Sequence, residues 1–426
     1  MSSQNPNASP IAYTSSPIPG RAKTPLTRAQ WVILILLVLS VTINYIDRGS
    51  LSAADKYLQQ DFGLDPEQRG TVYSAFFAGY AGLMLVAGWL VDRFDVNRVL
   101  AVGFMLWTTA ILFTGAASGF GMLIALRILL GAGESVAYPA YSKILAGSYH
   151  EQQRGFANAA IDAGSKIGPA LSLLAGGLLM ERFGWRSFFY AMGGLSFLWM
   201  IPWFIMVPKG ERLIPTAVGR VPTMLEICRK RQAWGTFMGL FGGNYAWYFL
   251  LTWIPGYFRM ARHYSQHEVA IFGSLPLWVT AASTLTCGLL SDRLIARGWD
   301  ASRVRKSFLG TGVLGATIML PAALVTDSNL SLLLICIASM AIGIESSNVW
   351  ATTQRMAGPW ASGRWTGMQN LFGNIPGIIA PWFTGWVVKM TGSFTSAFLA
   401  ATVMLLISFV GYVILVPRVE PIDWEA

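Results

Sequence analysis

The hexapeptide GWLVDR at residues 88–93 returns as GLLSDR at residues 288–293. Both copies share the pattern G-x-L-x-D-R, and each ends the second apolar run of its half of the chain. A weaker repeat follows at matching positions, with GES at residues 133–135 and IES at residues 344–346. One such short motif can arise by chance, but two copies at matched positions indicate an internal duplication. Duplicated halves are typical of secondary transporters, which bind substrate between their repeats.

The composition is that of a membrane protein. Of the 426 residues, 54% are hydrophobic and only 12% are charged, whereas about 25% are charged in a typical soluble domain. Apolar runs of about 20 residues can each cross about 30 Å of hydrocarbon. We therefore predict an all-α multi-pass membrane protein with twelve transmembrane helices in two pseudo-symmetric six-helix halves. The expected helices are 30–49, 71–91, 98–117, 120–144, 155–180, 187–207, 233–257, 268–291, 306–325, 329–350, 365–388 and 394–416.

The polar stretches between these runs divide the chain. A basic, proline-containing stretch is the only long break, and its end, from Met224 to Trp234, forms either a short amphipathic helix on the membrane surface or a solvated loop. The predicted segments are a disordered tail (1–28), an N-terminal half (29–207), a linker (208–232), a C-terminal half (233–416) and a second tail (417–426).

The formal charge of +10 follows from topology. If the N-terminus is cytoplasmic, the cytoplasmic segments hold 21 Lys and Arg residues and the outside loops hold seven. The positive-inside rule then predicts that both termini are cytoplasmic in the plasma (inner) membrane. Residues 1–28 lack the apolar stretch of a signal peptide. The charge therefore does not indicate nucleic-acid binding, and the expected partners are a small solute, protons and lipid around a monomer.

An enzymatic function is not expected. The three cysteines and three histidines are scattered, so neither a disulfide framework nor a zinc site is predicted. No H-E-x-x-H motif occurs, and no nucleophile–base set is apparent. We expect no metal and no cofactor.

Seven charged residues lie inside the predicted spans. Each costs about 2.5–3.5 kcal/mol at the bilayer centre on insertion scales, so such residues must face a cavity or one another. Arg127 and Glu134 are two helical turns apart on one face, and Asp162 and Lys166 are at i and i+4 and can pair directly. The seven are Asp47, Arg48, Arg127, Glu134, Asp162, Lys166 and Glu345.

This mixed set suits the coupled transport of an anion and protons. Arginine binds a carboxylate in a planar, bidentate manner, and a carboxylate in a low dielectric can carry a proton near neutral pH. The alternative is a static ion-pair network that only orients helices. For Glu345, near the cytoplasmic half of its helix, a structural or gating role is expected.

Further polar side chains in the spans are candidates for binding hydroxyl groups. Asn370 and Asn374 are at i and i+4 and share a helical face. Their alternative role is to hold helices together by hydrogen bonds. The other candidates are Tyr45, Tyr80, Asn244, Tyr245, Trp247 and Tyr248.

Taken together, these motifs resemble the major facilitator superfamily and, within it, the anion:cation symporter family. The similarity covers residues from about 30 to 416, and the GSKIG stretch at residues 164–168 is most similar to hexuronate and related sugar-acid transporters. The motifs are residues 88–98 with Gly88, Asp92, Arg93 and Arg98, NYIDR (44–48), RILLGAGE (127–134), RG (154–155), GWR (184–186) and NYAWY (244–248).

The resemblance implies proton-driven uptake of organic anions by alternating access. Family arginines that bind the substrate carboxylate correspond to Arg48 and Arg127. Family acids that couple protons correspond to Asp47 and Glu134. A family Tyr and Asn correspond to Tyr80 and Asn370.

Three residues depart from the family pattern. Asp95 stands where a Gly is usual, and Asp162 and Lys166 stand where neutral amides are usual. The two charges either pair with each other, or Lys166 binds a second anionic group, which would favour a dicarboxylate.

We therefore expect proton-coupled symport of a small organic anion, a sugar acid such as a hexuronate or aldonate. The alternatives are a carrier for a dicarboxylate or aromatic acid, or an exporter or exchanger. The predicted residues are Arg48, Arg127, Tyr45, Tyr80, Ser165, Lys166, Asn244, Tyr245, Trp247, Asn370 and Asn374 for substrate, Asp47, Glu134 and Asp162 for protons, and Asp92, Arg93, Arg98, Asp292, Arg293 and Glu345 for gating.

Overall fold

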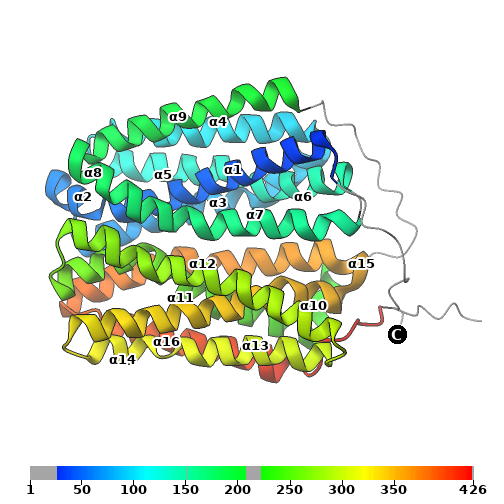
Figure 1. Cartoon of the computed structure of the whole chain (residues 1–426). Coiled ribbons are helices and arrows are strands. Elements are labelled where there is room, and N and C mark those ends of the chain that lie inside the picture. The colour runs from blue at the N-terminus through cyan, green and yellow to red at the C-terminus, as the bar shows by residue number, and fades with distance from the viewer. Residues whose placement is uncertain (1–25, 150, 208–221, 425–426) are drawn as a thin grey trace, which may run out of the picture.

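The computed structural model describes residues 26–149, 151–207 and 222–424. These ranges contain helices and no strand, and the two halves of the chain form two helical bundles packed side by side (Figure 1). Each of the twelve predicted ranges is helical, and ten of the helices are long and apolar enough to cross a membrane. The predicted fold class is therefore confirmed. Residues 1–25 of the predicted N-terminal tail and 208–221 of the linker lie outside the described residues.

The N-terminal half carries six long helical segments and one short helix, α2. Its fourth segment bends between two helices, and its fifth contains a short π-helix. The elements are α1 (Arg28–Ala53), α2 (Asp55–Phe62), α3 (Pro66–Arg93), α4 (Val96–Thr114), α5 (Phe120–Glu134), α6 (Ala137–Ser148), α7 (Glu151–Leu171), η1 (Ser172–Gly176), α8 (Gly177–Phe183) and α9 (Trp185–Met206).

The C-terminal half repeats this plan after a short helix, α10, at the end of the linker. The long helix α15 joins two predicted spans at Gly358, whose φ of 67° is accessible to glycine at little cost. The elements are α10 (Met224–Arg229), α11 (Arg231–Arg262), α12 (Gln266–Ala296), α13 (Ala301–Ala316), α14 (Met319–Leu324), α15 (Ser328–Thr391), α16 (Thr395–Phe409) and η2 (Val410–Leu415).

Local sequence explains where several helices begin. Thr27, Asp65 and Ser265 start α1, α3 and α12 with reciprocal capping boxes. Asp95, which departs from the family pattern, is the N-cap of α4 and accepts a hydrogen bond from the backbone N–H of Arg98 at 3.0 Å. The carboxylate therefore satisfies a free amide at a helix start.

Glycines bring the charged helices of the N-terminal half close together. A Cβ on Gly131 of α5 would lie 2.1 Å from the carbonyl oxygen of Phe76 on α3, and a Cβ on Gly79 would lie 2.3 Å from that of Ile128. On α7, a Cβ on Gly168 would lie 2.6 Å from the Tyr45 side chain of α1. These small residues allow backbone contact, as is usual between membrane helices.

The two halves meet closely near the end of the bundle that carries α2, which we call the α2 end; the opposite end, with the C-terminus, is the terminal end (Figure 1). Ser74 of α3 donates a hydrogen bond to the Ile378 carbonyl of α15 at 2.6 Å. A Cβ on Gly70 would lie 2.4 Å from the Pro381 oxygen, and one on Gly385 would lie 2.2 Å from the Pro66 oxygen. Backbones of the two halves are therefore in contact at this end.

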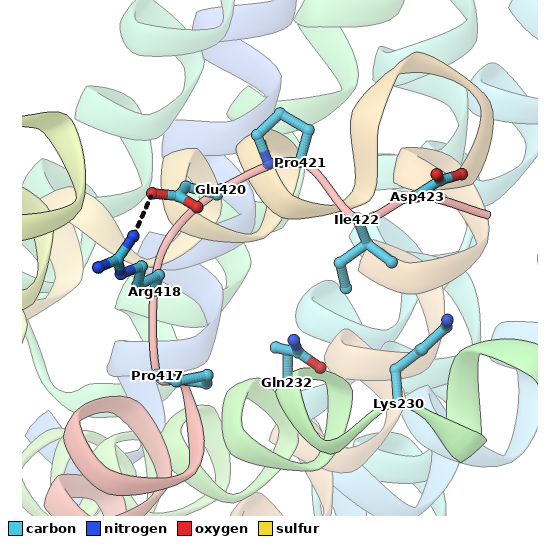
Figure 2. A pocket seen from close by; sticks show the side chains of 8 residues that line it. All are labelled: Lys230, Gln232, Pro417, Arg418, Glu420, Pro421, Ile422 and Asp423. Carbon is cyan, nitrogen blue, oxygen red and sulfur yellow. Dashed lines mark ion pairs between the residues drawn. The ribbon is translucent and has the colours of Figure 1, made fainter. Parts of the chain in front are cut away.

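The segment that follows η2 is ordered against the C-terminal half. The Val419 N–H donates to Ser302 Oγ at 2.8 Å, and Arg355 Nε donates to the Val419 carbonyl at 3.0 Å. The Trp424 indole donates to the Ala357 carbonyl at 3.0 Å. A hollow of about 430 Å³ lies between this segment and the start of α11, with Arg418 3.7 Å from Glu420 at its rim (Figure 2). None of the seven intramembrane charged residues lines this hollow, and we assign it no role in substrate binding.

Candidate functional site

A buried ion pair joins α1 to α5. Arg48 Nε donates to Glu134 Oε2 at 2.8 Å, and the two residues are 6% and 0% exposed. The guanidinium carbon also lies 4.6 Å from the ring centre of Tyr45 and 4.9 Å from that of Tyr80. The sequence predicted all four residues for the site, and the structure places their side chains around Arg48.

Arg127 and Asp47 lie beside this pair without strong partners of their own. Arg127 Nη1 is 3.5 Å from the backbone oxygen of Asp47, at the limit of a hydrogen bond, and its Nε has no partner among the described residues. Both carboxylate oxygens of Asp47 are buried and likewise lack a described partner. Leaving buried charged groups unsatisfied is costly, so this cluster is suited to receive an anion, a proton or both.

Further polar side chains lie between Arg48 and α7. The Tyr138 hydroxyl donates to the Tyr45 hydroxyl at 3.2 Å. Ser165 Oγ donates to the Asp162 backbone oxygen at 2.7 Å and lies 3.4 Å from its carboxylate. Ser165 therefore satisfies its own helix rather than being free for a ligand.

A direct pair between Asp162 and Lys166, one of the two readings left open by the sequence, is not among the described ion pairs. Instead, Lys166 Nζ lies 5.2 Å from the ring centre of Trp247 on α11. The i, i+4 spacing permits a pair but does not require one, because the lysine chain is long enough to turn toward the other half. Of the two readings left open by the sequence, a local pair is not seen among the described ion pairs, and the binding of a second anionic group by Lys166 stays a prediction.

The polar residues of the C-terminal half form a chain of hydrogen bonds between α11 and α15. Asn244 Nδ2 donates to the Gly373 carbonyl at 2.7 Å, and the Tyr248 hydroxyl donates to Asn374 Oδ1 at 3.0 Å. Asn374 Nδ2 in turn donates to Asn370 Oδ1 at 3.1 Å. Asn374 therefore holds helices together, whereas Asn370 and Asn244 keep part of their surface exposed. Tyr245, also predicted for the site, is 2% exposed within the hydrophobic core.

Glu345 lies inside the C-terminal half, on α15. It is 5% exposed, and its Oε1 has no described hydrogen-bond partner. A Cβ on Gly243 of α11 would lie 2.7 Å from that oxygen. The buried carboxylate therefore occupies space that only a glycine leaves free.

The second copy of the G-x-L-x-D-R repeat lies at the terminal end of α12. Asp292 is exposed and pairs with Arg305 of α13 at 3.8 Å, and Arg305 also donates to Asn348 of α15 at 3.0 Å. These contacts remain within the C-terminal half. In the first copy, the exposed Arg93 ends α3, and the side chain of Asp92 lies outside those described. Arg98 and Arg293 are exposed.

A second charged cluster, which sequence reasoning missed, lies at the α2 end. Asp55 of α2 pairs with Arg69 of α3 at 2.5 Å and with Arg259 of α11, and it accepts a hydrogen bond from the Tyr73 hydroxyl at 2.6 Å. Arg259 Nη1 also donates to Gln59 Oε1 at 2.8 Å. Burial favours the neutral acid, but the two arginines outweigh it and lower the pKa of Asp55 below its ordinary value. We call Asp55, Arg69 and Arg259 the α2-end cluster; it joins the two halves.

Arg69 and Arg259 fall just outside the predicted helices 71–91 and 233–257 but lie within helices in the structure. Helices α3 and α11 extend beyond the apolar runs and include them, and Arg69 is 1% exposed. Lys389 of α15 adds a more exposed inter-half pair to Asp65 at 3.1 Å and to Glu67 at 2.7 Å. The sequence signal for this cluster was the presence of opposite charges, Asp55 and Arg69, just outside an apolar run.

No group of three or more His, Cys, Asp and Glu side chains placed to hold a metal is found in the part of the chain that the structure describes.

Comparison with known proteins gives consistent matches over nearly the whole chain. The profile of the Major Facilitator Superfamily matches residues 37–381. The chain is 29% identical to a probable galactarate/D-glucarate transporter of Escherichia coli K12, over 93% of this chain and 95% of that protein. It is 27% identical to a probable L-galactonate transporter of the same strain, over 96% and 94%. A solved bacterial homolog of the human lysosomal transporter Spinster has the same fold, with a TM-score of 0.77 and 18% identity over 92% of this chain and 98% of that one.

Proposed function

Because the chain belongs to the major facilitator superfamily, whose matched relatives are transporters and not enzymes, we propose that it is a proton-coupled symporter of a small organic anion. The substrate proposed is a sugar acid, bound near the middle of the membrane between the two halves. The relatives named for galactarate, D-glucarate and L-galactonate support this class.

The observation that carries the proposal is the buried contact between Arg48 and Glu134 at 2.8 Å. An arginine is the side chain best suited to a substrate carboxylate, yet here a carboxylate of the protein already occupies it. Substrate and Glu134 therefore compete for the same guanidinium. Protonation of Glu134 removes its charge and frees Arg48 for the substrate, so a proton and an anion bind together.

Arg127 and Asp47 extend the same logic. Arg127 has a free Nε and only a 3.5 Å contact to the Asp47 backbone, so it can anchor a carboxylate at little cost to existing bonds. The Asp47 carboxylate, buried without a described partner, is a second place for a proton. Tyr45 and Tyr80, whose rings lie within 5 Å of the Arg48 guanidinium carbon, and the partly exposed Asn370 are proposed to donate to substrate hydroxyls.

The positive-inside bias supports a cytoplasmic location for the terminal end. The α2 end then faces outward, and the inter-half contacts there hold the outward path shut. Transport proceeds as the halves rock about the central site, and the repeat motifs at the ends of α3 and α12 act at the cytoplasmic side. This is the alternating-access scheme of transporters built from repeats.

Uptake by the purified protein in proteoliposomes tests the proposal. Radiolabelled galactonate and galactarate are supplied outside, and an inward proton gradient is imposed or withheld. We expect accumulation that depends on the gradient. Uptake that ignores the gradient would refute proton coupling, and no uptake of either acid would refute the sugar-acid substrate.

Variants separate the two functions of the site. We expect Glu134→Gln to abolish gradient-driven accumulation while retaining exchange of labelled for unlabelled substrate across the membrane, because Arg48 is then permanently free. We expect Arg127→Ala to lose the thermal stabilisation that substrate gives. Glu181→Gln is the control, since Glu181 is a partly exposed acid of α8 that pairs with His267 away from the site.

A further inference from the structure

Lys166 points away from its own half. Gly164 and Gly168 place α7 against α1, since a Cβ on either would lie within 2.7 Å of the Val41 or Tyr45 side chain. A residue midway between them is about 200° around the helix, so Lys166 faces the opposite direction. Its Nζ accordingly lies 5.2 Å from the ring centre of Trp247, which belongs to the other half. The ammonium group therefore lies at the boundary between the halves.

The charge of Lys166 is not neutralised by contact. No ion pair to Lys166 occurs among the described residues, although Asp162 is one turn away and Glu345 is near enough to interact through space. Lys166 is half-buried, so water screens it only in part. An ammonium group over an aromatic face, partly removed from water and without a bound carboxylate, is a binding position for an anion.

Lys166 and Arg127 stand in separate surroundings. Arg127 interacts with Asp47, Glu134 and Arg48, and its guanidinium lies 5.1 Å from the ring centre of Phe76. Lys166, by contrast, lies over the ring of Trp247 and interacts through space with Glu345, and both of these residues belong to the C-terminal half. Arg127 therefore offers a cation within the N-terminal half, and Lys166 offers a second cation at the boundary between the halves.

We propose that the substrate is a dianion whose first carboxylate binds Arg127 and whose second binds Lys166 against Trp247. This inference rests on the proposed transport of sugar acids and narrows it to diacids. Because Lys166 reaches toward the C-terminal half, a substrate bound to both Arg127 and Lys166 spans the boundary between the halves. The relatives do not decide this point, since one is named for a diacid and the other for a monoacid.

Two matched pairs of probes test the inference: galactarate against galactonate, and glucarate against gluconate. The members of each pair differ in one terminal group, a carboxylate or a hydroxymethyl. Binding to the detergent-purified full chain is measured by competition and by thermal stabilisation. Since a hydrogen bond to a charged group contributes about 1.5–3 kcal/mol, we expect the diacids to bind about 10- to 100-fold more tightly.

Three variants assign the preference to the lysine. We expect Lys166→Gln to lose the diacid preference while its affinity for the monoacids stays unchanged, and Lys166→Arg to keep the preference. We expect Lys143→Gln, a change of a lysine on α6, to behave like the unaltered protein.

Each outcome bears on a different claim. Equal binding of monoacids and diacids by the unaltered protein, or an equal loss of both in Lys166→Gln, would overturn the dianion inference and leave the sugar-acid proposal standing. Failure of all four acids to bind would overturn both. Retained diacid preference in Lys166→Gln would also overturn the inference, because the second carboxylate would then have another partner.

Discussion

Replacing Arg259 by Gln should open the α2 end without unfolding the protein. Arg259 makes two contacts across the boundary between the halves, an ion pair with Asp55 and a hydrogen bond to Gln59 at 2.8 Å. Glutamine removes the charge but leaves Asp55 paired with Arg69 at 2.5 Å within the N-terminal half. The substitution therefore weakens the contact between the halves and leaves no buried charge unpaired.

The magnitude follows from burial. The Arg259 side chain is 18% exposed and that of Asp55 4%, so water screens this pair less than a surface pair. Hydrogen bonds to charged groups contribute about 1.5–3 kcal/mol, so the ratio of open to closed molecules should rise about 10- to 100-fold. The pairs of Lys389 are 35–43% exposed and contribute about 0.2–1 kcal/mol, so Lys389→Gln should shift the ratio by less than about 10-fold.

Distances between spin labels at the α2 end measure this ratio. Labels at Gln60 of α2 and Asn329 of α15, both exposed, are attached in a background lacking Cys228, Cys287 and Cys336. Double electron–electron resonance in lipid nanodiscs then reports the closed and open populations. We expect a longer-distance population to grow in Arg259→Gln.

Arg262 provides a matched control on the same helix and at the same end. Its hydrogen bonds go to the Tyr257 hydroxyl at 2.7 Å and to the carbonyl oxygens of Ala322 and Thr326, all within the C-terminal half. Arg262→Gln should therefore leave the distance distribution unchanged. An equal shift in both variants, or no shift in a folded Arg259→Gln protein, would refute the assignment of Asp55–Arg259 as a contact that breaks on opening.

Two further predictions concern the same fold. Because the pKa of Asp55 is lowered in the closed form, the contribution of Asp55 to closure is present above the ordinary pKa of about 3.9 and is lost as pH falls through the lowered pKa. The distances between the labels should therefore not change between pH 5 and 8. Opening that titrates near pH 6 and disappears in Asp55→Asn would contradict this prediction. Gly131→Ala places a Cβ 2.1 Å from the Phe76 carbonyl oxygen, and this overpacking should destabilise the protein by about 1–3 kcal/mol and lower its melting temperature. Gly82→Ala is the control, because Gly82 has open space around it, and it should leave the melting temperature unchanged. Equal melting temperatures for the two variants would show that α3 and α5 can separate freely.

The helices were predictable because membrane thickness imposes a length on every apolar run. What the runs do not reveal is how far a helix continues after its residues become polar. Helices α3 and α11 begin or end about five residues beyond the predicted spans, at Pro66 and Arg262. Arg69 and Arg259 therefore fell outside the predicted spans, and their pairing with Asp55 could not be predicted from the sequence.

The intramembrane charges were identifiable individually, since each is too costly to lie in lipid by chance. Their pairing was not identifiable, because it depends on how α1 and α5 are rotated against each other. Arg48 and Glu134 are 86 residues apart, and glycine contacts bring their helices together. Conversely, the spacing of Asp162 and Lys166 permitted a local pair. In the structure Gly164 and Gly168 face α1, so Lys166, on the opposite side of α7, lies against Trp247.

The ordered C-terminal segment has a practical consequence for experiments. Trp424 is anchored to the Ala357 carbonyl, and its ring lies 6.0 Å from that of Trp365, so this segment is tied to the bend of α15 at Gly358. An affinity tag or fluorescent protein placed close behind Trp424 would start beside this anchor and beside the bend of α15. A flexible spacer before any fusion, and avoidance of C-terminal truncation, would keep that bend as it is in the unmodified chain.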